Sequence, residues 1–358
     1  MYRLAIRAFA LSALVALLVA PAWGAADGRK GTAGATELLI PVGPRGTALS
    51  GTEAGDVTGV EAMFWNPAGL GAVEGTEVMF THTSYLAGMS LNYAAAATKV
   101  GNMGVLGVSA KVLSIGDILV TTEQAPDGTG QILQPTFTVL GATWAKEMTD
   151  RVRFGGTFQL VNEHVADVTA TGLAMDFGVQ YDTGWRGLRF GMAMKNFGPS
   201  MAYGGSGFNE AINDVNQDPT AAKRTLSYSS ASFEMPSYFT LAATYDLYHY
   251  GDNRLHLLGS FQNNNFFGDN FAGGAEWSYH SLFALRGSWF GTLTSATDPT
   301  TGDDTMSFHS GDDIYSGYAL GAGIVVPAAG TKLGVDLAWK PVKSYFDDTV
   351  ELGLNFKF

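Results

Sequence analysis

The residues that could carry out chemistry are few in this chain, and they are not grouped. Its six histidines are spread from His82 to His309, and none has the H-E-x-x-H spacing that holds a catalytic zinc ion. The sequence contains no G-x-S-x-G elbow for a nucleophilic serine and no Walker loop for phosphate. We therefore expect no catalytic residue, no cofactor and no metal site, and we predict that the protein is not an enzyme.

Two acidic clusters are the remaining candidates for a cation site. Asp214-x-Asn216-x-Asp218 has the residue order that opens a calcium loop, but Pro219 stands where such a loop needs glycine. The second cluster consists of Asp303, Asp304, Asp312 and Asp313. Both clusters lie between predicted strands, and we interpret them as solvated loops.

The first 26 residues have the pattern of a secretory signal peptide. Arg3 and Arg7 form a basic region, and the apolar run Ala8–Ala20 is followed by small residues at two plausible cleavage sites, 22–24 and 24–26. The chain has no cysteine, which excludes a lipoprotein signal, disulfides and cysteine metal sites. We expect a bacterial protein that is exported with residues 1–26 removed.

The composition fits neither a helical protein nor a disordered one. Glycine accounts for 46 of the 358 residues, aromatic residues for 12% and charged residues for only 15%. The formal charge of −12 becomes −14 when Arg3 and Arg7 leave with the signal peptide, which argues against nucleic acid as a partner. No later apolar run is long enough for a transmembrane helix.

Asp56–Leu70 is the stretch around which the N-terminal region is organised. Apolar residues from Val57 to Phe64 recur at helical spacing, with Asp56 available as an N-cap. Pro67 disfavours helical geometry at Asn66, and the order Asn66-Pro67-Ala68-Gly69 predicts a type I turn. So short a helix is marginal alone, so we expect it to pack against a larger structure.

Residues 27–73 lack the alternation of strands, and we interpret them as a plug or hatch. From Thr76 onward apolar and polar residues alternate; for example, Leu255, Leu257 and Phe261 oppose His256, Ser260 and Gln262. Most of these segments have the length of a tilted membrane-spanning strand. They lie near residues 76–84, 89–99, 103–113, 134–147, 151–164, 170–182, 186–197, 235–249, 253–264, 269–279, 282–290, 315–326, 331–342 and 348–358.

Tight turns alternate with long polar loops at 123–133, 198–234 and 291–314, as in outer-membrane barrels. A soluble sandwich could also alternate, but it would not carry an apolar face opposite charged residues on nearly every strand. We predict an all-β fold, a transmembrane antiparallel outer-membrane β-barrel of about 14 strands, with 27–73 as a hatch in its lumen and 74–358 as the barrel.

Predicted inward-facing charges carry both signs, which indicates ion-paired packing around a plug rather than an ion-selective ring. Aromatic residues near strand ends can supply interfacial girdles, and the terminal strand with Phe356 and Phe358 is typical of the signal read by the outer-membrane insertion machinery. The inward charges are Arg153, Asp176, Arg189, Lys195, Glu276, Arg286, Lys332, Asp336 and Lys340.

The third strand is a candidate for a lateral opening, because Gly104 and Gly107 lie in it and Gly116 follows it. Glycine weakens a strand and often marks a bulge or bend. The alternative is a closed wall in which small residues accommodate the hatch.

The sequence resembles the FadL-like barrels, and within them the PorV/PorQ family. Glu37–Gly46 and Gly51–Val60, followed by Phe64-Trp65-Asn66-Pro67-Ala68-Gly69-Leu70, are similar to that family's N-terminal motifs, and Lys332–Pro341 is similar to its penultimate strand. The resemblance implies a hatch inside the barrel, an integral location in the bacterial outer membrane, and a lateral gap at an early strand.

Two functions are open under this resemblance. PorV-like members receive exported cargo by its C-terminal domain during type IX secretion, whereas FadL-like members move apolar small molecules across the outer membrane. We favour the secretion role because the N-terminal motif fits that subfamily better, and we keep hydrophobic-solute transport as the alternative. The expected partners are outer-membrane lipid, the insertion machinery, and either secreted cargo domains or apolar small molecules.

Overall fold

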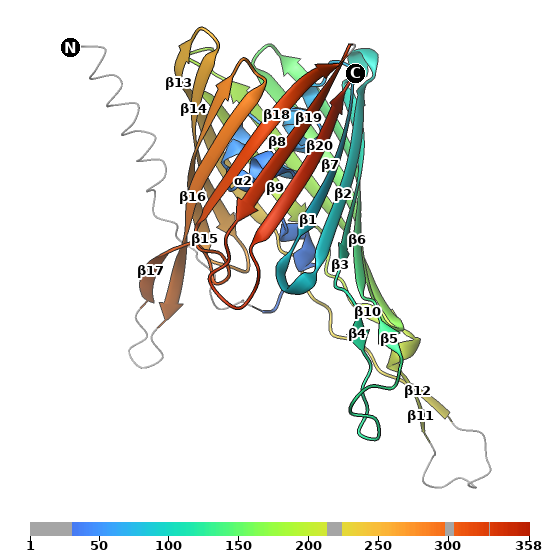
Figure 1. Cartoon of the computed structure of the whole chain (residues 1–358). Helices are drawn as coiled ribbons and strands as arrows, with labels where there is room; N and C mark the ends of the chain where they lie inside the picture. The colour runs from blue at the N-terminus through green and yellow to red at the C-terminus, as the bar shows by residue number, and fades with distance from the viewer. Residues whose placement is uncertain (1–30, 213–223, 298–303, 329) are drawn as a thin grey trace.

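The computed structural model describes residues 31–212, 224–297, 304–328 and 330–358. Within these residues, fourteen antiparallel strands form one closed barrel (Figure 1), in which β1 pairs with β20 and β8 pairs with β9. Around the ring the strands are β1 (Thr76–Ser84), β2 (Ser90–Lys99), β3 (Val105–Ser114), β6 (Thr136–Thr149), β7 (Val152–Val165), β8 (Val168–Asp182), β9 (Arg189–Phe197), β13 (Tyr238–Tyr250), β14 (Asn253–Asn264), β15 (Asp269–Tyr279), β16 (Phe283–Thr297), β18 (Tyr318–Ala328), β19 (Thr331–Lys340) and β20 (Thr349–Lys357).

The predicted fold class is confirmed, and each predicted strand segment coincides with one strand of the ring within a few residues. β16 is the main exception, because it continues past residue 290 to Thr297 and pairs there with β17 (Asp304–Ser310). Phe308 of β17 packs against the rings of Trp289 and Phe271, which accounts for the extension of the sheet.

Like the loop that carries β17, the other two predicted long loops contain short strands. β4 (Ile118–Leu119) pairs with β5 (Ile132–Leu133), β10 (Tyr203–Gly205) pairs with β8, and β11 (Asn209–Ile212) pairs with β12 (Arg224–Ser227). These elements and β17 project from the rim that carries the long loops (Figure 1). The predicted signal peptide and the cluster Asp214–Asp218 lie outside the described residues.

Burial alternates along the strands as the sequence predicts. In β20, Glu351 is buried whereas Leu352 and Leu354 are exposed; in β14, Ser260 is buried and faces the lumen. The apolar side chains on the outer face therefore form the surface expected to contact lipid. Among the described residues, no helix is both long and apolar enough to cross a membrane.

The N-terminal segment, defined here as residues 31–73, lies inside the barrel, where its short helices are drawn in blue (Figure 1). Its side chains form one buried cluster with inward residues of β1, β2 and β3, among them Met79, Leu91 and Val105. The segment contains η2 (Thr36–Leu39), α2 (Pro44–Ala48), η3 (Thr52–Gly55), α3 (Ala62–Trp65) and η4 (Pro67–Ala72).

The helix predicted to begin at Asp56 is shorter than expected, because α3 starts only at Ala62. Gly59 has a φ of 81°, a left-handed conformation that a right-handed helix cannot contain. Asp56 forms ion pairs with Arg45 and Arg189 instead of capping the helix. The helix ends before Asn66, as Pro67 predicts.

The wall is continuous at β3, where the sequence indicated an opening. β3 pairs with β2 from Ser90↔Ser114 to Lys99↔Val105, and its pairing with β6 is equally unbroken. A side chain at Gly107 would meet Met63 and Leu70 of the N-terminal segment. Gly104 has a φ of 112° and Gly116 a φ of 93°, so both occupy turn conformations that favour glycine. The structure matches the alternative of a closed wall with small residues.

Candidate binding cavity

The Asn66-Pro67-Ala68-Gly69 turn anchors the N-terminal segment to the barrel wall. The Asn66 side-chain amide donates to the Ala54 carbonyl at 2.7 Å and to the Val179 carbonyl of β8 at 3.2 Å. Its oxygen accepts from the Ala68 amide at 3.2 Å, and the Gly69 amide donates to the Asn66 carbonyl at 3.0 Å. The predicted turn is present and continues into η4.

Glycines of the wall make room for this turn. A Cβ atom at Gly178 of β8 would collide with the Asn66 side-chain oxygen, and one at Gly155 of β7 would collide with the Pro67 carbonyl. Gly69 itself lies against the Val57 carbonyl. The motif is therefore a close backbone-to-wall contact, which only residues without a side chain permit.

Charged side chains hold the centre of the N-terminal segment. Arg45 of α2 contacts Glu53 at 2.7 Å and Glu276 of β15 at 2.9 Å. Glu276 also contacts Arg286 of β16 at 2.7 Å, and Arg286 contacts Asp336 of β19 at 2.5 Å. Six of the nine inward charges predicted from the sequence are thus paired with each other or with the segment: Asp176, Arg189, Lys195, Glu276, Arg286 and Asp336. Arg153 pairs with Glu147 instead, and Lys332 is exposed.

Further carboxylates and amides of the wall bind the backbone of the N-terminal segment. Glu351 of β20 accepts from the Gly43 amide at 2.7 Å and from the Thr47 hydroxyl at 2.6 Å. Gln180 of β8 donates to the Val57 carbonyl at 2.9 Å. Within the segment, Glu61 accepts from the Gly46 amide at 2.9 Å, and burial raises the pKa of Glu61 to about 7.

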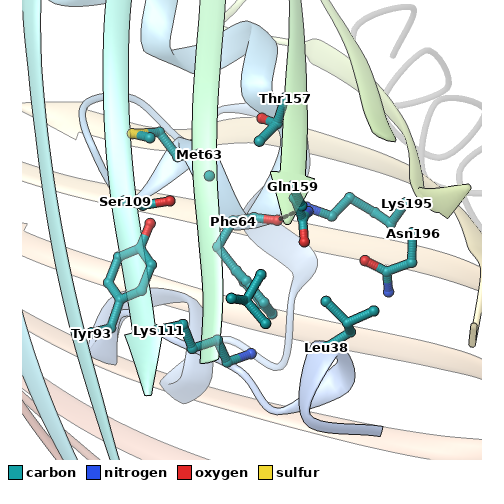
Figure 2. Close-up of a pocket in the computed structure, with 12 residues that line it drawn as sticks. Leu38, Met63, Phe64, Tyr93, Ser109, Lys111, Thr157, Gln159, Lys195 and Asn196 are labelled. Carbon is teal, nitrogen blue, oxygen red and sulfur yellow. Dashed lines mark hydrogen bonds between the residues drawn. The ribbon is translucent and has the colours of Figure 1, made fainter. Parts of the chain in front are cut away.

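Phe64 lies between two buried lysines (Figure 2). The Lys111 ammonium is 4.7 Å and the Lys195 ammonium 5.2 Å from the centre of the Phe64 ring. Lys111 donates to the Ile40 carbonyl at 2.6 Å, and Lys195 donates to the Phe64 carbonyl and to Asp176, both at 2.5 Å. These groups surround a chamber of about 30 Å³, which has room for a buried water molecule.

A larger cavity in the lumen, called here the outer cavity, has a volume of about 880 Å³. Its floor includes Ile40, Phe64 and Trp65 of the N-terminal segment, and Tyr85 and Ile314 line it from loops of the long-loop rim. Phe64 also borders the smaller chamber, so its ring separates the two spaces. Phe64 and Trp65, which the sequence placed inside the barrel, thus face an open volume on one side.

Aromatic and aliphatic side chains contribute much of the lining of the outer cavity. Lys340 adds a cation whose ammonium is 3.9 Å from the ring centre of Tyr315 and 4.6 Å from that of Phe290. A large apolar concavity with a few polar groups is the usual form of a small-molecule site. The apolar lining residues are Leu39, Ile40, Phe64, Trp65, Tyr85, Leu86, Met89, Leu113, Ile115, Phe137, Tyr238, Phe267, Ala272, Phe290, Ile314 and Tyr315.

Phe356 and Phe358 are not among the residues that line the outer cavity, whereas Asp312 and Asp313 border it. Phe356 pairs with Val78 of β1, and Phe358 is exposed at the chain end, so their role as an insertion signal stays a prediction. Asp312 accepts from the Ile314 and Tyr315 amides; it orders a turn, and no metal cluster is present among the described residues.

Sequence reasoning missed the buried charges Lys111 and Glu163. Both lie on the inward face of their strands, so strict alternation would have identified them. It also missed Glu37, Arg45, Glu53 and Glu61, which lie in the aperiodic segment where no periodicity marks a face.

These features define a closed antiparallel β-barrel with an internal N-terminal segment and an apolar cavity. No family model matches the sequence, and no curated protein matches it. Among solved structures, it is similar to the CymD monoaromatic hydrocarbon channel, with a TM-score of 0.56, 11% identity, and coverage of 89% of this chain and 98% of that one.

The Pseudomonas putida toluene transporter TodX has a TM-score of 0.54 at 11% identity, with 88% and 96% of the two chains covered. A Pseudomonas aeruginosa FadL homologue has a TM-score of 0.51 at 10% identity, with 88% and 97% covered. The chain therefore has the fold of the FadL-like outer-membrane barrels.

Proposed function

We propose that this protein takes small apolar molecules into the outer membrane from the side of the long loops. The outer cavity carries this proposal, because it offers about 880 Å³ of mainly apolar space directly above the N-terminal segment. Sites of about 300–1,000 Å³ bury most of the surface of a small organic ligand. Removing that surface from water stabilises the complex by about 25 cal/mol per Å² of apolar area.

The names of the structural neighbours support the same proposal. CymD is described as a monoaromatic hydrocarbon channel and TodX as a toluene transporter. Because identity to both is only 11%, the likeness concerns the fold, and the substrate class rests on the outer cavity of this chain.

Passage beyond the outer cavity requires a rearrangement of the N-terminal segment. Phe64 and Trp65 close the floor, and the ion pairs of Arg45 and the bonds of Asn66 tie the segment to β15 and β8. We propose that the segment acts as a hatch, with residues 27–73 as its extent and 74–358 as the barrel. We also propose that the chain is exported, that its signal peptide is cleaved, and that transport involves no catalytic step.

The sequence favoured type IX secretion over hydrophobic-solute transport, and the comparisons support the second. The narrower resemblance to PorV/PorQ rests on Glu37–Leu70 and Lys332–Pro341. Membership of that family and a secreted cargo partner both stay predictions. Of the three neighbours described above, two are named for the passage of hydrocarbons and the third is a FadL homologue.

Uptake by intact Gram-negative cells tests the proposal. Cells that produce the protein should take up radiolabelled naphthalene several-fold faster than cells without it. Ala272→Trp, which fills the outer cavity beside Ser260 and Phe290, should lower uptake to background. The matched control is Leu257→Trp on the outer face of the neighbouring strand. Equal uptake by cells with the natural protein, cells with Ala272→Trp and cells without the barrel would overturn the proposal.

A further inference from the structure

The outer cavity has two unlike walls. One wall consists of apolar side chains from the N-terminal segment, β3 and β6, among them Phe64, Leu113 and Phe137. The other carries amide and hydroxyl side chains from β14, β15 and β16, chiefly Gln262, Asn270 and Thr292, beside Ala272 and Phe290 of the same strands. A cavity for a plain hydrocarbon needs only the first kind.

The polar wall is a row fixed by strand register. Gln262 is paired with Asn270, and Asn270 is paired with Thr292, so the three residues lie side by side on adjacent strands at one height. Neighbouring strands are about 4.8 Å apart, which gives the row a length of about 10 Å. Ser260, two residues before Gln262, adds a hydroxyl on the same face.

Several polar atoms of this row keep unused hydrogen-bonding capacity. Thr292 donates to one end of the Asn270 amide at 2.9 Å, and Gln262 donates to Asn264 at 2.8 Å. Each bond uses one end of the Asn270 or Gln262 amide. Within the described residues, the other end of each amide and the Ser260 hydroxyl have no bond to protein. These free atoms belong to side chains that line the outer cavity.

The two walls face each other across the barrel. In the ring of fourteen strands, β3 and β15 are seven strands apart in either direction, as are β6 and β16. Leu113 and Asn270 therefore come from opposite sides, and so do Phe137 and Thr292. A molecule that fills the outer cavity must touch both walls at once.

We propose that the preferred ligand is a neutral amphiphile, an apolar ring system or chain with hydroxyl or carbonyl groups along one edge. This inference rests on the proposed function and specifies its substrate class. A plain hydrocarbon would displace water from the row without replacing its hydrogen bonds, which costs free energy. A ligand with polar groups on one edge replaces those bonds and keeps its apolar face against Phe64, Leu113 and Phe137.

The charges of the outer cavity argue for a neutral ligand rather than an anion. The row holds amides and hydroxyls, and His309 beyond it is bonded to Ser307 at 2.8 Å. Lys343 already donates to the Asp312 carbonyl at 2.5 Å, and Lys340 lies over two aromatic rings. The carboxylates of Asp312 and Asp313 also border the outer cavity, so an anion would meet like charges.

Calorimetric binding of three matched probes to the purified full-length protein tests this inference. The probes are naphthalene, 2,3-dihydroxynaphthalene and 1-naphthoate, each measured on the natural protein and on Asn270→Leu, Gln262→Leu and Lys340→Met. We expect each substitution in the row to weaken binding of 2,3-dihydroxynaphthalene by about tenfold, since a hydrogen bond is lost. Naphthalene should bind both row variants at least as tightly as the natural protein, which also shows that they are folded.

The other outcomes distinguish a failure of the amphiphile inference from a failure of the proposed function. If naphthalene binds and the row variants bind 2,3-dihydroxynaphthalene as tightly as the natural protein does, the amphiphile inference is wrong and the proposed function stands. If 1-naphthoate binds most tightly and Lys340→Met abolishes that preference, the ligand class is anionic and the inference is overturned. If none of the probes binds, the proposed function fails, and the inference fails with it.

Discussion

The lumen contains two regions that differ in whether the polar atoms of their inward side chains have partners within the protein. Around α2 and η4 the wall presents charges and amides that bind the N-terminal segment, as Glu276 binds Arg45 and Glu351 binds the Gly43 amide. Around the outer cavity, Gln262, Asn270 and Ser260 keep free polar atoms beside apolar surface. The first region is an interface between the wall and the N-terminal segment, and the second has the properties of a binding site for a small molecule.

This difference shows how one barrel can hold a segment firmly and still bind a small molecule. A buried ion pair adds little net stability, but removal of one partner leaves an uncompensated charge and is strongly unfavourable. The charges of the first region therefore fix the position of the N-terminal segment. The outer cavity contains no such ion-pair network with the segment among the described residues, so a neutral molecule can enter it without competing for a charge.

Deletion of residues 31–73 should have the largest effect. Because the segment fills the lumen, its removal should convert a nearly non-conducting barrel into a wide pore with large stepwise currents in planar bilayers. Deletion of residues 117–133, the loop that carries β4 and β5, is the control and should leave the current low. If the two deletion variants conduct alike, the N-terminal segment does not block the pore.

Substitution of Arg45 should show that the first region depends on paired charge. Arg45→Met leaves Glu53 and Glu276 buried without their cation, and we expect a loss of about 3–5 kcal/mol in the free energy of unfolding in urea. Arg153→Met is the control, because Arg153 contacts a partly exposed Glu147 at 3.5 Å and should lose only about 0–1 kcal/mol. Similar losses would contradict the distinction between the segment's network and an ordinary surface pair.

The outer face should respond to charge differently from the lumen. Leu257→Arg places a cation on the lipid-facing side of β14, and we expect a loss of about 2–4 kcal/mol in folding free energy. Ser260→Arg, three residues away, should be milder because the added side chain faces the outer cavity and not lipid. Equal folding yields of the two variants in lipid vesicles would disprove the assignment of faces.

The smallest effect is expected where the turn meets the wall. Gly178→Ala introduces a methyl group against the Asn66 side chain, and we expect a loss of about 1–3 kcal/mol from overpacking. Gly273→Ala is the matched control, since no heavy atom lies within 4 Å of its added Cβ. Thermal unfolding of both variants measures the difference. A Gly178→Ala protein as stable as the control would show that the turn is not held tightly.

The barrel was largely predictable from the sequence, because its physical signal is local. Each strand has to alternate between lipid and lumen, so residues such as Leu255 and His256 reveal their faces without knowledge of any partner. The same rule would have found Lys111 and Glu163. The end of β16 was missed because it depends on β17 and the ring of Phe308, which is contact between distant residues.

The interior of the barrel was less predictable, because it depends on the register between strands and on contacts between the N-terminal segment and the wall. The spacing of Val57 to Phe64 predicts a helix, but the positive φ of Gly59 and the ion pairs of Asp56 override it. The row of Gln262, Asn270 and Thr292 arises only when three strands pair in one register. Nothing local to these residues indicates a shared wall.

A crystal structure of the protein soaked with 1-bromonaphthalene tests the central claim most directly, because the anomalous signal of bromine locates the ligand. The account predicts a bromine peak inside the outer cavity, in contact with Phe64, Leu113 or Phe137, and no such peak in Ala272→Trp. Bromine found only on the outer face of the barrel, with the outer cavity free of it, would contradict the claim that this cavity binds apolar molecules.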